Sequence, residues 1–542
     1  MKPVILGATL LIPASAAVVP GAATATTRFW SKAAGRLARS PWAAPLIAAF
    51  VSIAANALVW AIAGTPVPTV HDEFGYLLAA DTFANGRLTN PPHPFWEHFE
   101  TFHVIQQPTY AAKYPPGQGL VLAAGQHFCG HPYVGVLAAT AAACGLVGWM
   151  LQAWLPPRWA LFGGALVALH PLMAIWAGSY WGGAVAVAGG ALVAGAVPRI
   201  VQRPGLRTGV PLGVGLVVLA NSRPFEGAVL GVSAVTAMAA WAIRRRPPRV
   251  RLLTAGGAAA GVLACGAAAT AYYNHRVTGS ATTMPYVVHE REYGAAPLFV
   301  FQGPVPIPAY RHKIIEDFHI GFDLGTYQRL RTPSGFAVEC VDRIAVLARM
   351  FMQPIGIWVA ALSLPALIRS RPPARFATGA CGTLVVAMLA TTWMFTHYAA
   401  PAMGLFVYLV VDGLRVLWVR RGRLRPAVRA LVVALPLLSL LSVARVAAER
   451  AAAPAGTMGV RAEIESSLRR EGGRHLILVS YPRDRPATGE WVFNRADLEA
   501  DPVVWARSMS AERDEALVRH YAGRSAWVLD ASAANPTLAR YK

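Results

Sequence analysis

The sequence predicts an α-helical polytopic membrane protein of about 11 transmembrane helices, followed by a small C-terminal α/β domain outside the membrane. Of the 542 residues 55% are hydrophobic and 14% are charged, whereas soluble domains carry about 25% charged residues. Mean hydropathy is +0.42. Long uncharged stretches alternate with short basic clusters, as in membrane proteins whose helices are joined by cytoplasmic loops. These features exclude a soluble, a disordered and a disulfide-rich secreted protein.

The uncharged stretches are long enough for eleven crossings, because a spanning helix needs about 20 mostly apolar residues. Residues 159–198 suffice for two crossings that turn near 178–183, and residues 208–243 hold two more, broken at 221–226. The predicted spans are 42–63, 132–157, two within 159–198, two within 208–243, 252–273, 350–368, 376–394, 399–419 and 430–447.

Charge placement predicts the orientation. Six segments between the spans contain 21 Lys and Arg residues and no acidic residue, and eleven crossings place all six on one side. By the positive-inside rule that side is the cytoplasm. The opposite side receives 26 of the 27 acidic residues; Asp412 is the exception, with Arg415 as its expected partner. The net charge of +22 therefore indicates cytoplasmic loops rather than a nucleic-acid partner.

This orientation divides the chain into three parts and places the N-terminus in the cytoplasm, which for a protein of a bacterial inner membrane puts the opposite loops in the periplasm. Residues 1–27 resemble a weak signal peptide, which we interpret as a nonessential extension. The parts are an extension with a cytoplasmic basic segment (1–41), a transmembrane core (42–447) with periplasmic loops 64–131 and 274–343, and a periplasmic α/β domain (448–542). In that domain we expect helices over 462–470 and 511–521 and strands over 475–481 and 525–529.

The first periplasmic loop contains the strongest candidate site. Two adjacent carboxylates, Asp72 and Glu73, follow the first span by about eight residues. Acidic residues are also common at helix N-termini, where the helix dipole favours them. The loop continues to Lys113-Tyr114-Pro115-Pro116-Gly117 and then to an apolar stretch, 120–125, that is too short to span. We expect this stretch to lie in the interface or to re-enter the membrane.

These residues resemble the GT-C superfamily, membrane glycosyltransferases that use polyprenyl-phosphate sugars. The resemblance is to the protein O-mannosyltransferases and the lipid A aminoarabinose transferases; it covers the layout of residues 40–450 and is sharpest over 71–125. The sequence departs from the family in having Lys-Tyr-Pro-Pro rather than Lys-Pro-Pro. It also has His397-Tyr398-Ala-Ala-Pro where relatives often have Arg-Tyr-x-x-Pro.

The resemblance implies roles for individual residues. Asp72 matches the catalytic aspartate, which accepts the acceptor hydroxyl's proton as it attacks the anomeric carbon, and Glu73 would orient the acceptor or help hold a metal. Lys113 matches the lysine that contacts the donor phosphate. The other predicted donor-phosphate ligands are Arg223 and His397, and the predicted substrate-binding residues are Tyr76, Tyr114, Glu226 and Tyr398.

Arg223 admits two interpretations. The uncharged flanks on either side of 223–226 are short for a hydrocarbon core about 30 Å thick, so the tip is expected at or slightly below the outer surface. An arginine there must be paired or face a wet cavity. It either forms an ion pair with Glu226 or meets a lipid-borne phosphate, and both are compatible.

Other polar residues give weaker signals. His71, His93, His98 and His103 lack tight ligand spacing, so a divalent-cation cofactor is left open. The run His289-Glu290-Arg291-Glu292-Tyr293 is either a solvated charge run or part of an acceptor groove.

The resulting hypothesis is an inverting glycosyltransferase, hexosyl or pentosyl. It would move a sugar from a polyprenyl-phosphate donor to an envelope glycan, lipid or protein hydroxyl on the periplasmic face. The alternative is a membrane transporter or lipid flippase without transferase activity, which predicts ionisable residues at mid-membrane and paired repeats with broken helices. A third possibility is a non-catalytic scaffold that presents residues 448–542. The sequence does not identify the sugar, the acceptor, the lipid length or the oligomeric state.

The orientation can be tested with fusion reporters. Because the charge asymmetry places basic loops in the cytoplasm, a reporter fused after Arg425 should be cytoplasmic and one fused after Lys542 periplasmic. Paired alkaline phosphatase and green fluorescent protein fusions measure this. Both positions reporting the same side would exclude the eleven-span arrangement.

Overall fold

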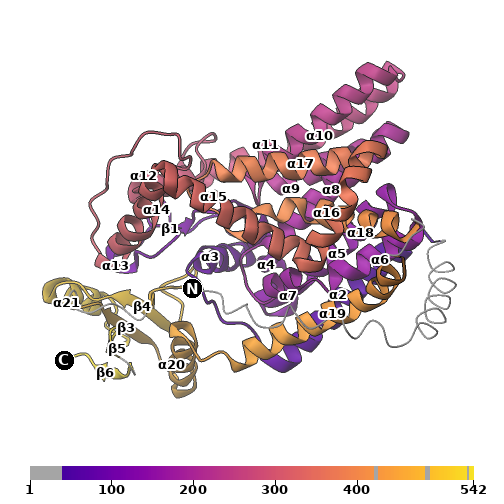
Figure 1. Cartoon of the computed structure of the whole chain (residues 1–542). Coiled ribbons are helices and arrows are strands. Elements are labelled where there is room, and N and C mark those ends of the chain that lie inside the picture. Colours follow the sequence, from indigo (N-terminus) through magenta and orange to yellow (C-terminus); the bar gives the residue numbers. More distant parts are fainter. Residues whose placement is uncertain (1–39, 420–424, 483–488, 534–535) are drawn as a thin grey trace.

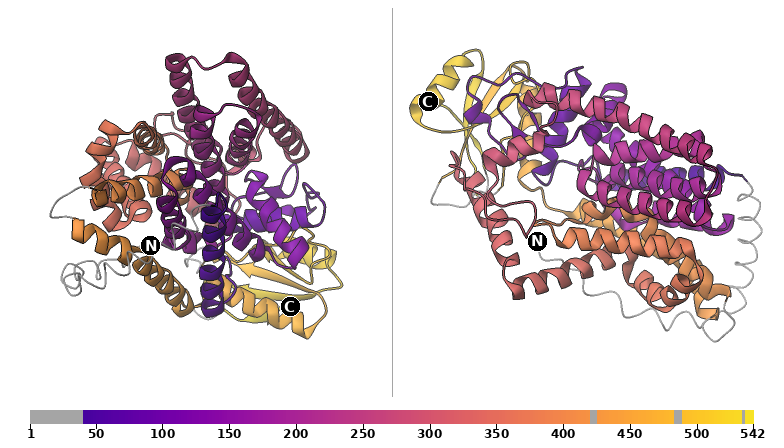
Figure 2. Two further views of the ribbon diagram at one scale, coloured as in Figure 1. Left: turned by 90° about the vertical axis from the view of Figure 1, so that its right-hand side faces the viewer. Right: turned by 90° about the horizontal axis from the view of Figure 1, so that it is seen from above.

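The structure is a computed structural model of the chain, and it describes residues 40–419, 425–482, 489–533 and 536–542. Most described residues belong to a bundle of long helices, with a small sheet domain at one end of the bundle (Figure 1, Figure 2). The predicted extension 1–27, the basic cluster 28–39 and residues 420–424 of the last basic segment lie outside the described residues.

Every predicted span coincides with helical structure. The helices are α2 (Ala43–Ala63), α5 (Pro132–Trp154), α6 (Pro157–Ala168) with α7 (Pro171–Ala177), α8 (Gly183–Gln202), α9 (Leu206–Ala220), α10 (Pro224–Arg245), α11 (Arg249–Thr278), α16 (Gln353–Ser370), α17 (Pro372–Leu389), α18 (Met403–Val419) and α19 (Arg425–Ala452). Among the described residues, eight helices are long and apolar enough to cross a membrane, or nine with the bent α6–α7 pair. The chain is therefore a multi-pass membrane protein, and the exact count of eleven stays a prediction.

The second predicted loop, 274–343, is largely helical. It contains α12 (Pro285–Tyr293), α13 (Lys313–Glu316), the π-helical η3 (Asp317–Leu324), α14 (Gly325–Leu330) and α15 (Pro333–Leu347). Helix α15 continues through the π-helical η4 (Ala348–Met352) into α16, so this apolar helix begins at Pro333 rather than near 350. Charged residues made the segment read as a loop. Arg343, however, is buried and donates to the carbonyls of Thr391 and Thr392 (2.7 and 2.8 Å), which offsets the cost of burying its charge.

Small residues let the central helices approach closely. Helix α8 is rich in Gly and Ala and packs against α5, α9 and η5 (Thr396–Ala402). A Cβ added at Gly190 would lie 1.8 Å from the carbonyl oxygen of Pro401. Such small residues at helix contacts are the usual basis of close packing in membranes, where water supplies no hydrophobic drive between helices.

The first loop folds into α3 (Asp72–Ala84), η2 (Trp96–Phe99), a two-stranded hairpin of β1 (Val104–Ile105) and β2 (Ala111–Ala112), and α4 (Pro116–Cys129). The predicted short apolar stretch 120–125 forms the middle of α4. That helix packs between α3 and α5 and buries Leu122. This arrangement holds α3 against the end of the bundle.

The C-terminal domain contains α20 (Thr457–Glu471), β3 (His475–Ser480), β4 (Val503–Arg507), α21 (Ala511–His520), β5 (Ser525–Asp530) and β6 (Leu538–Arg540). The sheet order is β4-β3-β5-β6, with β3 parallel to both neighbours and β6 antiparallel to β5. All four predicted elements are present. Strands β4 and β6 were not predicted, because each is short and carries an arginine at its end.

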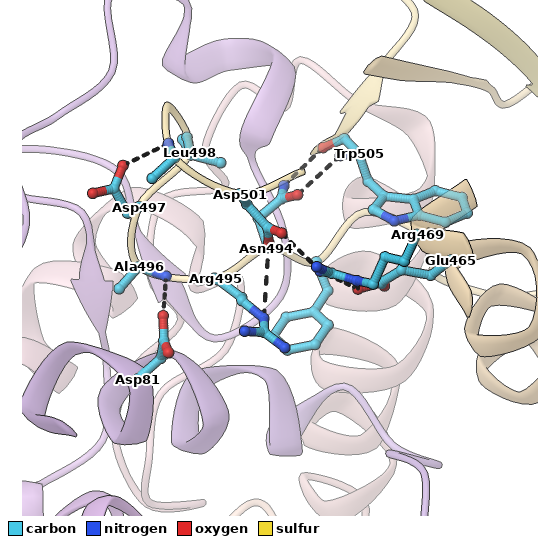
Figure 3. A network of polar contacts seen from close by, with 12 residues as sticks. Asp81, Glu465, Arg469, Asn494, Arg495, Ala496, Asp497, Leu498, Asp501 and Trp505 are labelled. Atoms are coloured by element: carbon cyan, nitrogen blue, oxygen red, sulfur yellow. Dashed lines mark hydrogen bonds and ion pairs between the residues drawn. The ribbon is translucent and has the colours of Figure 1, made fainter. Parts of the chain in front are cut away.

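The C-terminal domain shares a hydrophobic core with the first loop. Leu78 of α3 and Phe99 pack in one cluster with Leu476, Val504 and Leu517 of the domain. Figure 3 shows a polar contact at the same boundary, where the backbone N–H of Ala496 donates to Asp81 Oδ2 at 2.9 Å. The domain therefore packs directly on the helix that begins with Asp72.

Candidate active site

Asp72 lies at the first position of α3, where the helix dipole favours a negative charge. Its side chain is 29% exposed. The Tyr114 hydroxyl donates to Oδ1 at 2.7 Å. The ring nitrogens His71 Nδ1 and His103 Nε2 lie 3.8 and 3.7 Å from Oδ2. Asp72 is thus an oriented carboxylate that a ligand can reach.

Glu73 is buried, and backbone amides use both of its carboxylate oxygens. Oε2 accepts from the N–H groups of Thr69 and Val70 (2.7 and 3.1 Å), and Oε1 accepts from the N–H of Tyr180 (2.7 Å). Burial raises the pKa of Glu73 above its ordinary value, although these donors oppose the shift. Its contacts fasten the start of α3 to the turn before α8. Its predicted roles in orienting the acceptor or holding a metal stay predictions.

Two predicted substrate-binding tyrosines stack beside Asp72. The rings of Tyr76 and Tyr114 are 4.3 Å apart between centroids. Gly75 is required here, because a Cβ would lie 2.9 Å from the His103 carbonyl oxygen and 3.1 Å from the Tyr114 ring. Burial raises the pKa of Tyr76 to about 12 and that of Tyr114 well above 10, so both hydroxyls stay protonated and can donate.

Arg223 lies at the start of α10 with its guanidinium carbon 4.5 Å from the centroid of the Tyr398 ring. Within the part of the chain that the structure describes, no carboxylate lies within 4.0 Å of it. The ion pair with Glu226 that the sequence left open is therefore not formed, although Glu226 is buried nearby. The N–H of Gly117 donates to the carbonyl of Asn221 at 2.8 Å, which joins this tip to the Lys113 loop.

Lys113 is buried and already paired. Its Nζ lies 3.3 Å from Glu290 Oε1 and 5.2 Å from the centroid of the Tyr286 ring. Burial alone would raise the pKa of Glu290, but the Lys113 ammonium and His289 outweigh it and hold that pKa at about 2. Both partners come from α12. Because His289 and Tyr293 are also buried, the run 289–293 is not a solvated charge run.

His397 lies on η5, next to the rings of Trp181 and Tyr398. It is buried, its ring centroid is 4.8 Å from Trp181 and 4.9 Å from Tyr398, and its Nδ1 has no hydrogen-bond partner among the described residues. Arg223 thus lies over the Tyr398 ring, and the His397 ring meets the same tyrosine edge-to-face at an interplanar angle of 88°. The phosphate-binding role of His397 stays a prediction.

Among the described residues, two groups of side chains have the spacing of metal ligands. They are His71–Asp72–His103 and His93–Glu499–His520. Three of their four histidines, all but His520, are ones that the sequence singled out. In the second group His93 Nδ1 accepts from the N–H of Phe95 at 3.0 Å. The neutral ring then carries its proton on Nε2, the atom that faces Glu499 at 3.1 Å. This nitrogen is a donor, so the second group is a hydrogen-bonded link between the first loop and the C-terminal domain.

The first group fits a divalent cation better. His71 Nδ1 and His103 Nε2 share a hydrogen bond of 2.8 Å, which has to break for both nitrogens to bind a cation. Burial lowers the pKa of His71 and, with the Lys113 charge, lowers that of His103 well below 6.5. Neutral imidazoles beside a carboxylate are a donor set suited to zinc and other divalent metals.

Sequence comparisons give no assignment: no protein-family model matches the chain, and no curated protein matches it. Solved structures do match. ArnT from Cupriavidus metallidurans bound to undecaprenyl phosphate is 12% identical, with a TM-score of 0.52 over 89% of this chain and 92% of that chain. The apo state of the same protein gives a TM-score of 0.50 over the same shares at 12% identity.

The chain has the ArnT fold. The GT-C-like helical architecture with a small C-terminal α/β domain, predicted from the sequence, is thereby confirmed. The archaeal oligosaccharyltransferase AglB from Archaeoglobus fulgidus is a more distant match, with a TM-score of 0.45, 12% identity, and coverage of 90% of this chain and 69% of that chain.

The structure brings together residues that the sequence placed in three loops. Asp72, Tyr76 and Tyr114 come from the first loop, Arg223 from the α9–α10 turn and Tyr398 from η5. Sequence reasoning did not identify Glu290 as the partner of Lys113 or Tyr286 as its neighbour. Nothing local could have indicated either contact, because Lys113 and Glu290 are 177 residues apart.

The Lys113–Glu290 pair predicts a pH dependence of stability. The folded pKa of Glu290, about 2, lies below its ordinary value of 4.5. The pair therefore contributes stability above about pH 4.5, and this contribution is lost as the pH falls toward 2. We expect Glu290→Gln to lower the free energy of unfolding by on the order of 3 kcal/mol at neutral pH and by much less near pH 2.

Denaturant unfolding of the purified protein across this pH range measures the effect. The control is Glu316→Gln, whose side chain is 46% exposed. A Glu290→Gln penalty that is the same at pH 7 and pH 2.5 would contradict the assignment.

Proposed function

We propose that this protein is an inverting glycosyltransferase that moves a sugar from a polyprenyl-phosphate donor to an envelope acceptor at the periplasmic surface. The observation that carries the proposal is one site with a reachable carboxylate, Asp72, and a guanidinium without an acidic partner, Arg223. The fold supports it, because an ArnT structure of this fold holds undecaprenyl phosphate.

In the proposed reaction Asp72 accepts the proton of the acceptor hydroxyl while that oxygen attacks the anomeric carbon. The bond between the anomeric carbon and the phosphate oxygen breaks on the opposite face, and its electron pair leaves with the phosphate. Attack opposite the leaving group inverts the anomeric centre. Tyr114 occupies Oδ1 of Asp72, which leaves Oδ2 to receive the proton.

Arg223 is the better placed of the proposed phosphate ligands. A planar guanidinium makes a two-point contact with phosphate. The Arg223 guanidinium lies over the Tyr398 ring, which holds it in place by a cation–π contact. Lys113, in contrast, is paired with Glu290, so its ammonium meets the phosphate only if that carboxylate is displaced. We therefore assign charge neutralisation first to Arg223 and second to Lys113.

A divalent cation, if bound, would be held by His71, Asp72 and His103, and it would supply positive charge that stabilises an anionic substrate group. The roles of the other side chains would not change: Tyr114 orients Asp72, and the neutral histidines shield the Asp72 carboxylate from bulk water. Loss of transfer on chelator treatment, with recovery on adding back metal, would establish the requirement.

The proposed location is the inner membrane, with the C-terminal domain in the periplasm. The α10–α11 hairpin, whose turn lies in the basic segment 244–251, projects from the bundle away from the C-terminal sheet (Figure 1, Figure 2). This arrangement supports opposite sides for the basic loop and the sheet domain.

The transporter alternative has less support. It needs ionisable groups that are available to a substrate inside the membrane. The buried Asp412 is instead satisfied by Arg415 Nε at 2.6 Å, as the sequence predicted, by Tyr408 at 3.1 Å and by Arg371 at 3.5 Å.

Asp72→Asn tests the proposed base. The change keeps the shape and removes the proton acceptor, so transfer from a lipid-linked sugar should fall by about 10²–10⁴-fold while donor binding persists. Purified protein and radiolabelled donor give both quantities. Asp342→Asn, an exposed position on α15, is the matched control. Near-normal turnover in Asp72→Asn would contradict the proposed mechanism.

Arg223 variants test the leaving-group contact. Removing a hydrogen bond to a charged group costs about 1.5–3 kcal/mol, so Arg223→Ala should lower kcat by about 10–100-fold. Arg223→Lys should recover only part, since lysine lacks the two-point contact. Because Arg223 and Glu226 are not paired, Glu226→Gln should leave the Arg223 contact to the phosphate intact. Full activity in a stable Arg223→Ala variant would remove the arginine from the mechanism.

A further inference from the structure

The turn that joins α10 to α11 carries five arginines that have no role in the proposed reaction. They lie within residues 244–251, a segment without an acidic residue: Arg244, Arg245, Arg246, Arg249 and Arg251. All five are exposed. Among the described residues, none of the five guanidinium groups has an ion-pair, hydrogen-bond or aromatic partner. The turn is therefore a patch of unpaired positive charge.

Arginines in two other basic segments are satisfied within the protein. Arg199 donates to the carbonyls of Gly195 and Trp149, both at 2.8 Å, and Arg371 pairs with Asp412 at 3.5 Å. The positive-inside rule requires basic loops but not a dense group of unpaired arginines. The rule therefore accounts for the side on which the turn lies and not for its composition.

Three of the five arginines stand where the local backbone disfavours them. Arg246 ends α10 with φ 44° and ψ 54°, a left-handed conformation that favours glycine. Arg249 and Arg251 lie in the first turn of α11, which has no acidic residue and no side-chain cap. The positive end of the helix dipole opposes cations there. This repulsion is offset when an anion binds among the arginines.

The turn lies at the membrane surface opposite the proposed donor site. Helix α10 has 22 residues, about 33 Å at 1.5 Å per residue, which matches a hydrocarbon core of about 30 Å. Arg223 directly precedes α10, so the five arginines lie one membrane crossing away from it. The hairpin of α10 and α11 projects from the bundle at the end that carries them (Figure 1, Figure 2).

Exposed apolar side chains flank the arginines. Ile243, Val250 and Leu253 are 76%, 75% and 74% exposed, and only 11% of the most apolar 18 residues of α11 are buried inside the protein. These side chains favour hydrocarbon, whereas the long arginine side chains beside them reach the headgroup layer. The combination fits the boundary between lipid tails and headgroups better than it fits a soluble polyanion.

We propose that this turn binds the phosphate groups of anionic phospholipids in the leaflet that it faces. A planar guanidinium makes two-point contacts with phosphate oxygens, and dense basic clusters beside a membrane helix attract anionic headgroups. The bound lipid takes no part in the proposed transfer reaction. Failure of either proposal therefore leaves the other standing.

Native mass spectrometry of the full chain in detergent tests the site, with dioleoylphosphatidylglycerol as the anionic probe and dioleoylphosphatidylcholine as the zwitterionic one. The test variant is Arg245→Gln with Arg249→Gln and Arg251→Gln. All proteins also carry Arg223→Gln, which suppresses anion binding at the proposed donor site. We expect the parent to prefer phosphatidylglycerol. The dissociation constant for this lipid should rise at least about tenfold in the triple variant, because three charged contacts are lost.

The matched control changes three exposed arginines of two other basic segments, Arg203→Gln, Arg207→Gln and Arg369→Gln. It removes the same charge and should bind phosphatidylglycerol like the parent. Equal affinity in the parent and the triple variant overturns the proposal. An equal loss in the control also overturns it, since such a loss indicates general attraction to a positive surface rather than a site.

A charge-preserving variant separates lipid binding from membrane insertion. Arg245→Lys with Arg249→Lys and Arg251→Lys keeps the loop positive, so a reporter fused after Arg425 should stay on the side that it occupies in the parent. Lysine lacks the two-point contact, so the affinity of this variant should lie between those of the parent and the Gln variant. An affinity no higher than that of the Gln variant would reject a contribution from charge and, with it, the proposed site.

Discussion

The carboxylate of Glu73 fixes the geometry on which the candidate site depends. Its three backbone donors come from the chain before α3 and from Tyr180 before α8. Hydrogen bonds to an ionised acceptor are stronger than neutral ones, so this contact holds the start of α3 against the helical bundle. Successive residues on a helix point about 100° apart. The inward direction of Glu73 therefore turns Asp72 outward, where it is partly exposed.

The two cations of the site differ in a way that composition does not reveal. Lys113 has its compensating charge within the protein, in Glu290, whereas Arg223 has no carboxylate within contact distance among the described residues. Arg223 is half-buried and lies over the Tyr398 ring, so its guanidinium keeps N–H donors that no described carboxylate uses. In the proposed mechanism these donors are the ones available to an anionic ligand.

The features that the sequence predicted have local signals, whereas the features that it did not predict depend on contacts between distant parts of the chain. Spans such as α5 and α8 follow from hydropathy, and Asp72 followed from its place after the first span, because both signals are local. The pairing of Lys113 with Glu290 depends on how α12 packs against the first loop. Helix α15 was read as loop because Arg343 lies in it, and only tertiary contacts with Thr391 and Thr392 satisfy that charge. Local patterns cannot report such long-range compensation.

The C-terminal domain takes part in the site through packing rather than through reactive groups. Leu78 of α3 lies in one hydrophobic cluster with Leu476 and Leu517, and Asp81 accepts from the backbone of Ala496. The helix that begins with Asp72 is part of this shared core, so the C-terminal domain packs directly against the helix that carries the carboxylate. A change in how the sheet domain packs would therefore alter the position of α3 and, with it, the position of the Asp72 carboxylate.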